Sequence, residues 1–273
     1  MHNAKIEKVL KKFKDRKGSN MKKILFLKLL IVFYSTILCA VPLENGLIAY
    51  YSFNSDFSDD FNAYDAVGYN GATRASTGGF QNSGALLLDG SDDYLKVSNI
   101  SFNTSTGGAN TVSFWMKWYG GASQMPIGFY LQDLYLCAGY FGFNSANSDV
   151  TGISDSGMAN QWVHVTAVFY NGAPSPSTHS LYINGVKQTI QKVMGSTPYY
   201  YTMPDYFYLG TWSHFGYYFG GQLDEVMLFN RALSDTEVSH IYTNTPIPEP
   251  SSLMLLALSF SCYLLCIKFY NKI

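Results

Sequence analysis

Glutamate and aspartate side chains are the groups in this sequence whose type could carry acid–base chemistry. Hydrolysis of a glycosidic bond uses two carboxyl groups about 5–10 Å apart. Residues 41–245 contain three glutamates, of which Glu44 precedes the first expected strand and Glu237 belongs to a helix cap. Glu225 follows Asp224 in an expected strand, where adjacent side chains face opposite sides. The pattern therefore predicts no catalytic acid pair.

Histidine, cysteine and serine offer no clear second route to catalysis. The histidines of this region lie without the close spacing that is typical of zinc ligands, at positions His164, His179, His214 and His240. Cys137 is the single cysteine between residues 41 and 245, and we expect it to pack as a small apolar side chain. No Gly-x-Ser-x-Gly segment, the motif that often carries a nucleophilic serine, is present. A Ser-His-Asp triad built from residues that no motif marks is the alternative that stays open.

Two groups of side chains favour binding over catalysis. Aromatic residues crowd positions 199–219, and exposed aromatic rings with polar neighbours stack on sugars. Tyr200, Trp212 and Tyr218 are the expected ligand contacts because they lie in expected loops. The alternative is that these rings build the edges and core of a sheet.

Acidic side chains in an early loop indicate a possible cation site. Residues 55–60 contain Asp56, Asp59 and Asp60, and calcium takes six to eight oxygen ligands. The alternative is that loop acids only keep the domain soluble. The Asp92-Asp93 pair lies in an expected turn, where solvated carboxylates are common.

The net charge differs sharply between parts of the chain. The 273 residues carry a formal charge of −1, with 47% hydrophobic, 16% aromatic and 14% charged residues, which excludes a disordered chain. Residues 1–40 hold ten basic and two acidic residues, whereas residues 41–247 hold six basic and sixteen acidic residues. A central region at −10 repels phosphate, so we expect no nucleic acid partner.

The central region reads as a β-rich domain with one short helix. Short runs of β-forming residues alternate with Gly, Asn, Ser and Asp clusters, and Asn184-Gly185 is a strong hairpin signal. Ser234 and Glu237 form a capping box, which predicts a helix that ends before Pro246. The expected strands are residues 47–53, 85–89, 94–98, 111–118, 162–170, 181–184, 186–193, 206–210 and 222–229.

Six segments in order along this region resemble a LamG-like domain. They are GLIAYYSFN (46–54), LDGSDDYLKV (88–97), VSFWMKW (112–118), QWVHVTAVF (161–169), LYINGV (181–186) and GGQLDEVMLFNRALSDTEVSHIY (220–242). The resemblance implies the concanavalin A-like jelly roll of laminin G and pentraxin relatives, an all-β sandwich of two antiparallel sheets with adjacent terminal strands. Residues 120–156 match less well.

The resemblance also implies what the fold can hold. Jelly-roll relatives often place a structural calcium where the first loop meets the last strand, and by position Asp59, Asp60 and Asp224 match it. The alternative is that Asp224 pairs with Arg231 or with a backbone amide. Related hydrolases carry two glutamates on one concave strand, a pattern that this sequence lacks. We therefore expect no enzyme.

Both chain ends read as sorting signals. Lys22 and Lys23 precede an apolar run that ends near Ala40, the pattern of a secretory signal peptide, although a membrane anchor is the alternative. Pro248, Glu249 and Pro250 precede an apolar stretch with Lys268 and Lys272 at its end. This order resembles the PEP-CTERM sorting signal, which implies an envelope protease as partner and a membrane-inserted tail before cleavage. A plain single-pass anchor is the alternative.

These signals divide the chain into a leader at residues 1–40, a LamG-like domain at 41–245 and a sorting tail at 246–273. We expect an exported, non-catalytic module of the bacterial envelope or matrix that recognises a glycan or matrix polymer, with calcium as cofactor. One alternative is a structural matrix protein without a specific ligand. Another is a glycan-active hydrolase or lyase.

Overall fold

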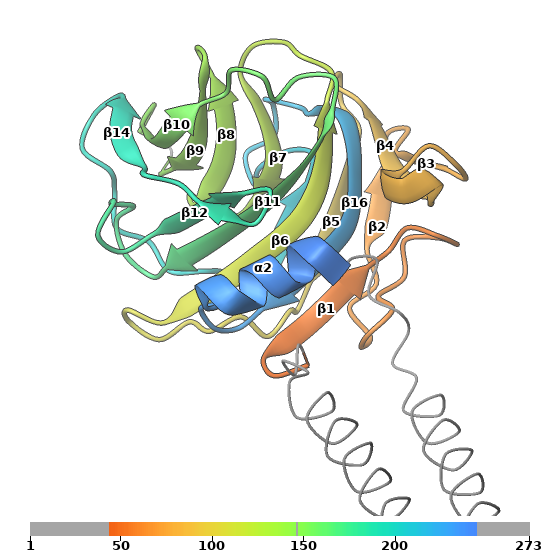
Figure 1. Cartoon of the computed structure of the whole chain (residues 1–273), viewed down its shortest axis with the longest axis horizontal. Coiled ribbons are helices and arrows are strands. Elements are labelled where there is room, and N and C mark those ends of the chain that lie inside the picture. Colours follow the sequence, from red (N-terminus) through yellow and green to blue (C-terminus); the bar gives the residue numbers. More distant parts are fainter. Residues whose placement is uncertain (1–43, 146, 245–273) are drawn as a thin grey trace, which may run out of the picture. The chain divides into compact units, whose positions relative to one another are not determined.

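Two antiparallel β-sheets face each other across a hydrophobic core, as the ribbon in Figure 1 shows. The computed structural model describes residues 44–145 and 147–244. The expected all-β, two-sheet antiparallel sandwich with one short helix near its end is confirmed. The expected signal peptide, the sorting motif and the terminal hydrophobic helices lie outside the described residues. No helix within 44–145 and 147–244 has the length and hydropathy needed to cross a bilayer.

The first sheet, which we call sheet A, has the strand order β13-β12-β11-β6-β16-β4-β3, and β1 also pairs with β16. Its strands are β1 (Leu47–Tyr51), β3 (Thr73–Ala75), β4 (Ala85–Asp89), β6 (Ala109–Trp118), β11 (Trp162–Tyr170), β12 (Ser180–Ile183), β13 (Val186–Lys187) and β16 (Gly220–Phe229). The pairing of β1 with β16 brings the two ends of the described chain together, as expected.

The second sheet, sheet B, has the order β14-β10-β9-β8-β7-β15-β5-β2. Its strands are β2 (Val67–Tyr69), β5 (Tyr94–Ser98), β7 (Gln124–Gly128), β8 (Asp133–Cys137), β9 (Tyr140–Asn144), β10 (Val150–Ser154), β14 (Gln191–Met194) and β15 (Tyr206–Leu209). A short 3-10 helix, η1 (Phe80–Asn82), precedes β4.

Most of the strands that the sequence pattern does not predict lie in sheet B, and β3 of sheet A is the other one. Residues 120–156 form β7, β8, β9 and β10, although Pro126, Gly128 and Gly142 interrupt the β-forming runs there. The expected strand at 186–193 is two strands in different sheets, β13 and β14. The turn at Asn184 and Gly185 joins β12 to β13 with φ values of 49° and 75°, the left-handed backbone that Asn-Gly favours.

The helix α2 (Asp235–Asn244) lies across the outer face of sheet A, near β6 and β12 (Figure 1). The Ser234 N–H and hydroxyl each donate to Glu237 at 2.8 Å, so the expected capping box is confirmed. Val238 and Ile241 are fully buried against Met227 and Phe229 of β16. The helix therefore seals an apolar patch that the sandwich core does not reach.

Strand alternation decides which side chains of sheet B point into the core and which point outward. Leu95, Leu134, Phe207 and Leu209 point into the core between the sheets. Their neighbours along the strands point to the opposite, outer face. These outward residues include Lys96 and Tyr206, which are half-buried, and Tyr94, Tyr135 and Tyr208, which are buried. The outer face of sheet B is therefore rich in tyrosine.

Candidate functional site

Aromatic side chains form two neighbouring sets of ring contacts over the outer face of sheet B, one around Tyr94 and one around Trp212. Tyr69 of β2 and Tyr94 of β5 are stacked with ring centroids 4.7 Å apart, and Tyr94 lies 5.4 Å from Phe215. We call the two sets together the aromatic band. Its rings are Tyr69, Tyr94, Tyr130, Tyr135, Tyr199, Tyr201, Tyr206, Tyr208, Trp212, His214, Phe215 and Tyr217.

The loop 210–219 joins the two halves of the band. Phe219 is buried and its N–H donates to the Gly210 carbonyl at 2.9 Å, which closes the loop. Phe215 and Tyr217 have φ values of 61° and 52°, on either side of Gly216 at 93°. This left-handed stretch turns the rings of Phe215 and Tyr217 outward, where they are 48% and 45% exposed.

The expected ligand residues lie in or near this band. Trp212 is half-buried, and its indole N–H donates to the Phe215 carbonyl at 2.9 Å while its ring packs 4.7 Å from His214. Tyr200 is exposed and Tyr218 is half-buried, and neither belongs to a ring pair in the described part of the chain. Their roles as ligand contacts stay predictions.

Several members of the band lie outside residues 199–219, the region in which the sequence predicts ligand contacts. Tyr69, Tyr94, Tyr130 and Tyr135 come from strands and turns far from residues 199–219 in the sequence. Only the pairing of β5 with both β2 and β15 brings the first two rings beside the loop. The alternation of side-chain direction along each strand indicates which rings share a face of the sheet, but it does not indicate which strands are neighbours.

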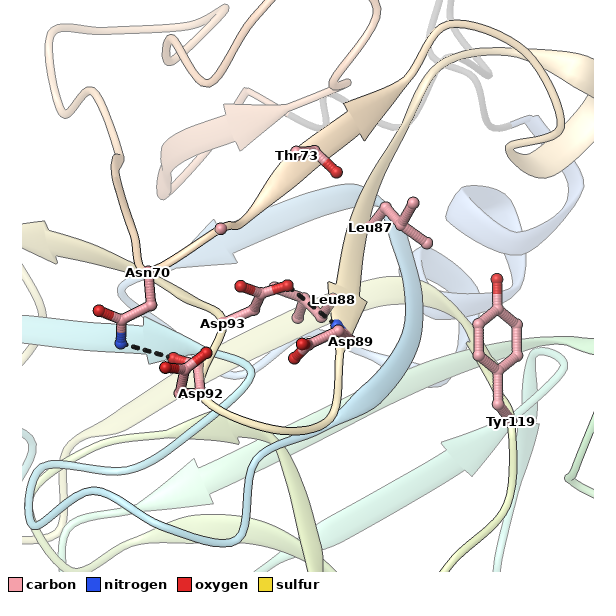
Figure 2. A pocket seen from close by; sticks show the side chains of 9 residues that line it. Asn70, Thr73, Leu87, Leu88, Asp89, Asp92, Asp93 and Tyr119 are labelled. Atoms are coloured by element: carbon pink, nitrogen blue, oxygen red, sulfur yellow. Dashed lines mark hydrogen bonds between the residues drawn. The ribbon is translucent and has the colours of Figure 1, made fainter.

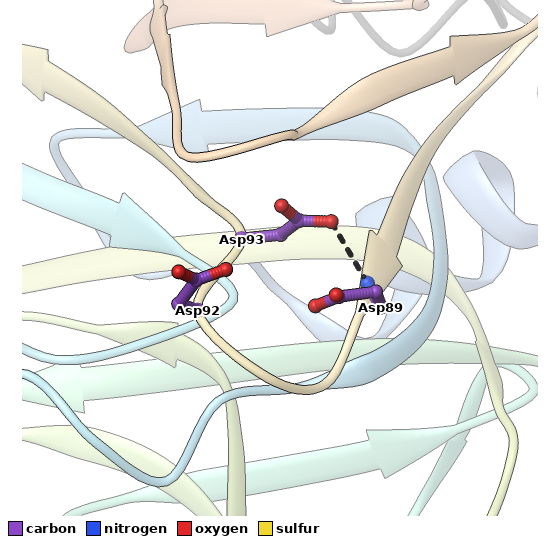
Figure 3. A group of neighbouring side chains, drawn as sticks. All are labelled: Asp89, Asp92 and Asp93. Atoms are coloured by element: carbon purple, nitrogen blue, oxygen red, sulfur yellow. Dashed lines mark hydrogen bonds between the residues drawn. The ribbon is translucent and has the colours of Figure 1, made fainter.

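A pocket of about 430 Å³ lies at the β4–β5 turn, and Figure 2 shows its lining. Asp89, Asp92 and Asp93 place one carboxylate oxygen each within 4.8 Å of one another, as Figure 3 shows. Tyr119 is half-exposed on one side, and Asn70 donates to the Asp92 carbonyl at 2.8 Å. These oxygens can accept hydrogen bonds from hydroxyl groups or bind a cation.

Within this turn the carboxyl groups have opposite pKa shifts. Burial raises the pKa of Asp93, whose Oδ2 accepts the Asp89 N–H at 3.1 Å. The Ser91 N–H, which donates to Asp89 Oδ1 at 2.7 Å, lowers the pKa of Asp89. The turn is therefore organised by its own carboxylates.

The residues expected to bind calcium are held by other contacts. Asp59 Oδ1 accepts the N–H groups of Tyr50 and Phe61, and its Oδ2 accepts that of Tyr64. Asp60 accepts both the N–H and the hydroxyl of Ser52. Asp59 therefore organises the first loop through three backbone amides.

Asp224 accepts hydrogen bonds from backbone amides, as one alternative expected. Its Oδ2 accepts the Phe80 N–H and the Ser83 hydroxyl, both at 2.8 Å, and its Oδ1 accepts the Glu225 N–H. Arg231 instead pairs with Glu237 at 2.6 Å. The carboxylate of Asp224 thus ties η1 to the last strand of sheet A.

A β-bulge overturns the expectation that Asp224 and Glu225 face opposite sides of a regular strand. Asp224 pairs with Trp115 and Met227 with Ser113, so β16 holds one extra residue here, and Glu225 has a φ of 52°. On its other edge, β16 pairs with β4 before this point and with β1 after it. Both acids are buried in the junction between these partners.

Burial raises the pKa of both acids at the bulge. The pKa of Asp224 rises to about 7, and that of Glu225 rises to about 8 with a further contribution from the charges of Asp224 and Asp60. The Tyr50 hydroxyl donates to Glu225 Oε2, whereas Oε1 is buried without a partner in the described part of the chain. That free oxygen fits a cation ligand, although in the described residues Asp59, Asp60 and Asp224 do not form a close three-carboxylate group. Calcium binding stays a prediction.

A serine–histidine contact lies under α2. The Ser113 hydroxyl is 3.1 Å from His164 Nε2, and both side chains are buried. His164 Nδ1 has no hydrogen-bond partner, so within the described residues this pair lacks the acid of a triad. Burial lowers the pKa of His164 to about 3. That the protein is not an enzyme stays a prediction.

The family of the chain follows from its match to a laminin G model. Residues 89–239 match the model described as the concanavalin A-like lectin/glucanases superfamily, which is more than half of the 273 residues. The chain belongs to this family. No curated protein matches it.

Solved structures share the fold at low identity. One is domain 4 of AbnA, a GH43 extracellular arabinanase from Geobacillus stearothermophilus, in complex with arabinotriose, with a TM-score of 0.51 and 20% identity over 72% of this chain and 98% of that chain. Another is the ligand binding domain of botulinum neurotoxin serotype D in complex with N-acetylneuraminic acid, with a TM-score of 0.52 and 16% identity. That match covers 74% of this chain and 52% of the toxin domain.

Proposed function

We propose that this protein is a non-catalytic glycan-binding module and that the aromatic band is its ligand surface. The observation that carries the proposal is the row of half-exposed rings on the outer face of sheet B, among them Tyr69, Phe215 and Tyr217. Such rings bury the apolar faces of sugars while nearby polar groups take the hydroxyls. The arabinotriose and N-acetylneuraminic acid complexes of the two related folds support a glycan as the ligand class.

The burial of the candidate acids supports binding over hydrolysis. Asp224 and Glu225 are 0% and 2% exposed, so neither can reach a sugar held on the surface. The acids that are exposed at the β4–β5 turn lie beside a pocket that can hold polar groups of a ligand.

Binding to immobilised polysaccharides tests the proposal. We expect the double variant Phe215→Ala/Tyr217→Ala to weaken binding by about tenfold, since each stacking contact contributes about 0.5–1.5 kcal/mol. Tyr119→Ala is the matched control, because Tyr119 is as exposed as Tyr217 but lies outside the band. Loss of binding in Tyr119→Ala alone would move the site to the β4–β5 pocket. No binding to any polysaccharide would favour a structural matrix protein.

We also propose that the module is exported and sorted at the bacterial envelope. The support is the signal peptide pattern in residues 1–40 and the Pro248-Glu249-Pro250 motif before an apolar tail. An envelope protease would remove the tail, which inserts in the membrane until then. Mass spectrometry of the envelope-associated protein should find neither residues 1–40 nor the apolar stretch after Pro250. An intact C-terminus would mean a permanent membrane anchor.

A structural calcium at the first loop belongs to this proposal. Asp60, Asp224 and the free oxygen of Glu225 would supply its ligands, and Asp59 would shape the loop. A bound calcium would compensate the charge of these carboxylates, of which Asp224 and Glu225 are buried, and fix η1 to β16.

A further inference from the structure

Three buried oxygen atoms at one end of sheet B have no hydrogen-bond partner among the described residues. They are Gln132 Oε1, Asp133 Oδ2 and Asp149 Oδ2. Asp133 and Asp149 are 0% exposed and Gln132 is 1% exposed. A buried polar atom without a partner costs roughly 1–3 kcal/mol, and more when it is charged. Three such atoms in one region therefore call for an explanation.

Each of the two carboxylates uses only one oxygen for protein contacts. Asp133 Oδ1 accepts the Phe129 N–H at 2.7 Å. Asp149 Oδ1 accepts the N–H and the hydroxyl of Ser145, and also the Asn147 N–H. The second oxygen of each is thus left available in the interior.

The two carboxylates belong to one neighbourhood. Asp133 of β8 pairs with Asn144 of β9, and the Asn144 side chain donates to the Asp149 carbonyl at 2.8 Å. The charge of Asp149 also contributes to raising the pKa of Asp133, after burial as the main cause. Gln132 precedes Asp133, and its amide nitrogen donates to the carbonyls of Gly172 and Tyr201.

Among the described residues, no lysine or arginine forms an ion pair with these acids. The ion pairs among residues 44–145 and 147–244 are Lys187 with Asp235 and Arg231 with Glu237, neither of which involves Asp133 or Asp149. Buried carboxylates without a partner are resolved either by a proton or by a bound cation.

We propose that Gln132, Asp133 and Asp149 form a buried calcium site, separate from the first loop. All three available ligand atoms are oxygens, which suit calcium or magnesium rather than zinc or copper. Calcium is favoured because it accepts an irregular set of carboxylate and amide oxygens, whereas magnesium requires a nearly ideal octahedron and retains its waters.

The residues around this site also hold the segment that carries Tyr199 and Tyr201. Asn147 donates to the Thr197 carbonyl, the Tyr199 N–H donates to Ser145 Oγ at 2.8 Å, and Gln132 donates to the Tyr201 carbonyl at 2.9 Å. Tyr199 and Tyr201 are members of the aromatic band. A cation at this site would fix one end of the aromatic band. Its effect on ligand binding rests on the proposed glycan function. The calcium site itself does not rest on that proposal.

Calcium titration of the chelator-treated full-length protein tests the site. We expect saturable binding of calcium, followed by calorimetry, that weakens at least tenfold in both Asp133→Asn and Asp149→Asn. Asp205→Asn is the matched control, because Asp205 is an exposed carboxylate that belongs to neither proposed calcium site, and it should retain this binding event. Absence of calcium binding overturns the proposal. So does binding that is unchanged in Asp133→Asn and Asp149→Asn, which would mean that a proton neutralises the buried acid.

Hydrogen exchange of the unmodified protein locates the cation even if a variant does not fold. With CaCl₂ against chelator, we expect increased protection in residues 129–149 and 197–203. Protection confined to residues 50–65 and 222–226 would place calcium at the first loop and overturn this site. Loss of glycan binding with calcium protection retained would count against the glycan function alone.

Discussion

Single carboxyl groups decide how this protein responds to pH. Asp224 and Glu225 lie at the bulge of β16 with pKa values raised to about 7 and about 8, mainly by burial. The folded state therefore binds more protons than the unfolded state between about pH 4 and pH 8. Their contribution to stability is full at low pH and is lost as the pH rises through these folded values.

Substitution Glu225→Gln should make the protein more stable at alkaline pH. In chelator, the free energy of unfolding of the wild type should fall between pH 6 and pH 9, and Glu225→Gln should reduce that fall by about 2 kcal/mol, since each pKa unit corresponds to about 1.4 kcal/mol. Urea unfolding at several pH values measures this. Glu44→Gln, at an exposed position, should leave the pH profile unchanged. A profile unaltered by Glu225→Gln would contradict the assignment.

Among the elements, α2 depends on its first turn. Ser234 and Glu237 cap the helix reciprocally, and the Arg231 guanidinium beside Glu237 is the main cause that lowers the pKa of that carboxyl to about 2. The buried side chains Val238 and Ile241 then cover Phe229. The cap and the apolar stripe thus fix the helix on sheet A together.

Removing the cap should destabilise the domain measurably. We expect Ser234→Ala to lower the free energy of unfolding by about 1 kcal/mol, because the first helical N–H groups lose an acceptor. Thermal unfolding checks this. Ser239→Ala, in the same helix and also exposed, should be neutral or slightly stabilising, because alanine is the better helix former. Equal losses in the two variants would contradict a specific role of the cap.

At the scale of the whole molecule, charge restricts the ligand class. Residues 44–244 carry sixteen acidic and six basic side chains. Lys96 lies over two rings of the aromatic band, those of Tyr206 and Tyr208, in cation–π contacts. A surface of this charge repels acidic polymers, whereas stacking on neutral sugars involves no net charge.

The salt dependence of binding and the charge of the ligand should therefore distinguish ring stacking on neutral sugars from electrostatic binding of acidic polymers. We expect retention on a neutral polysaccharide to change by less than twofold between 50 and 500 mM NaCl, because screening affects only charged contacts. A uronic acid polymer should not be retained in chelator. Strong retention of that polymer in chelator, lost at high salt, would contradict an aromatic site and point to a basic surface instead.

Local signals in the sequence determined much of this protein. The β-forming runs, the Asn184-Gly185 hairpin and the Ser234 cap each depend on neighbouring residues, so they could be predicted, and the ordered motifs implied the jelly roll. The four strands in residues 120–156 could not be predicted, because glycine and proline interrupt the runs of β-forming residues there.

Only the tertiary structure decided which distant residues share a site. The neighbours of β16 change from β4 to β1 at Glu225, and that junction buries two acids that a regular strand would separate. Sheet order likewise sets Tyr69 beside Phe215 through Tyr94, and turns at one sheet end set Asp133 near Asp149. Strand alternation gives the face of a side chain, but the order of strands depends on long-range pairing. That pairing is not encoded in any local pattern.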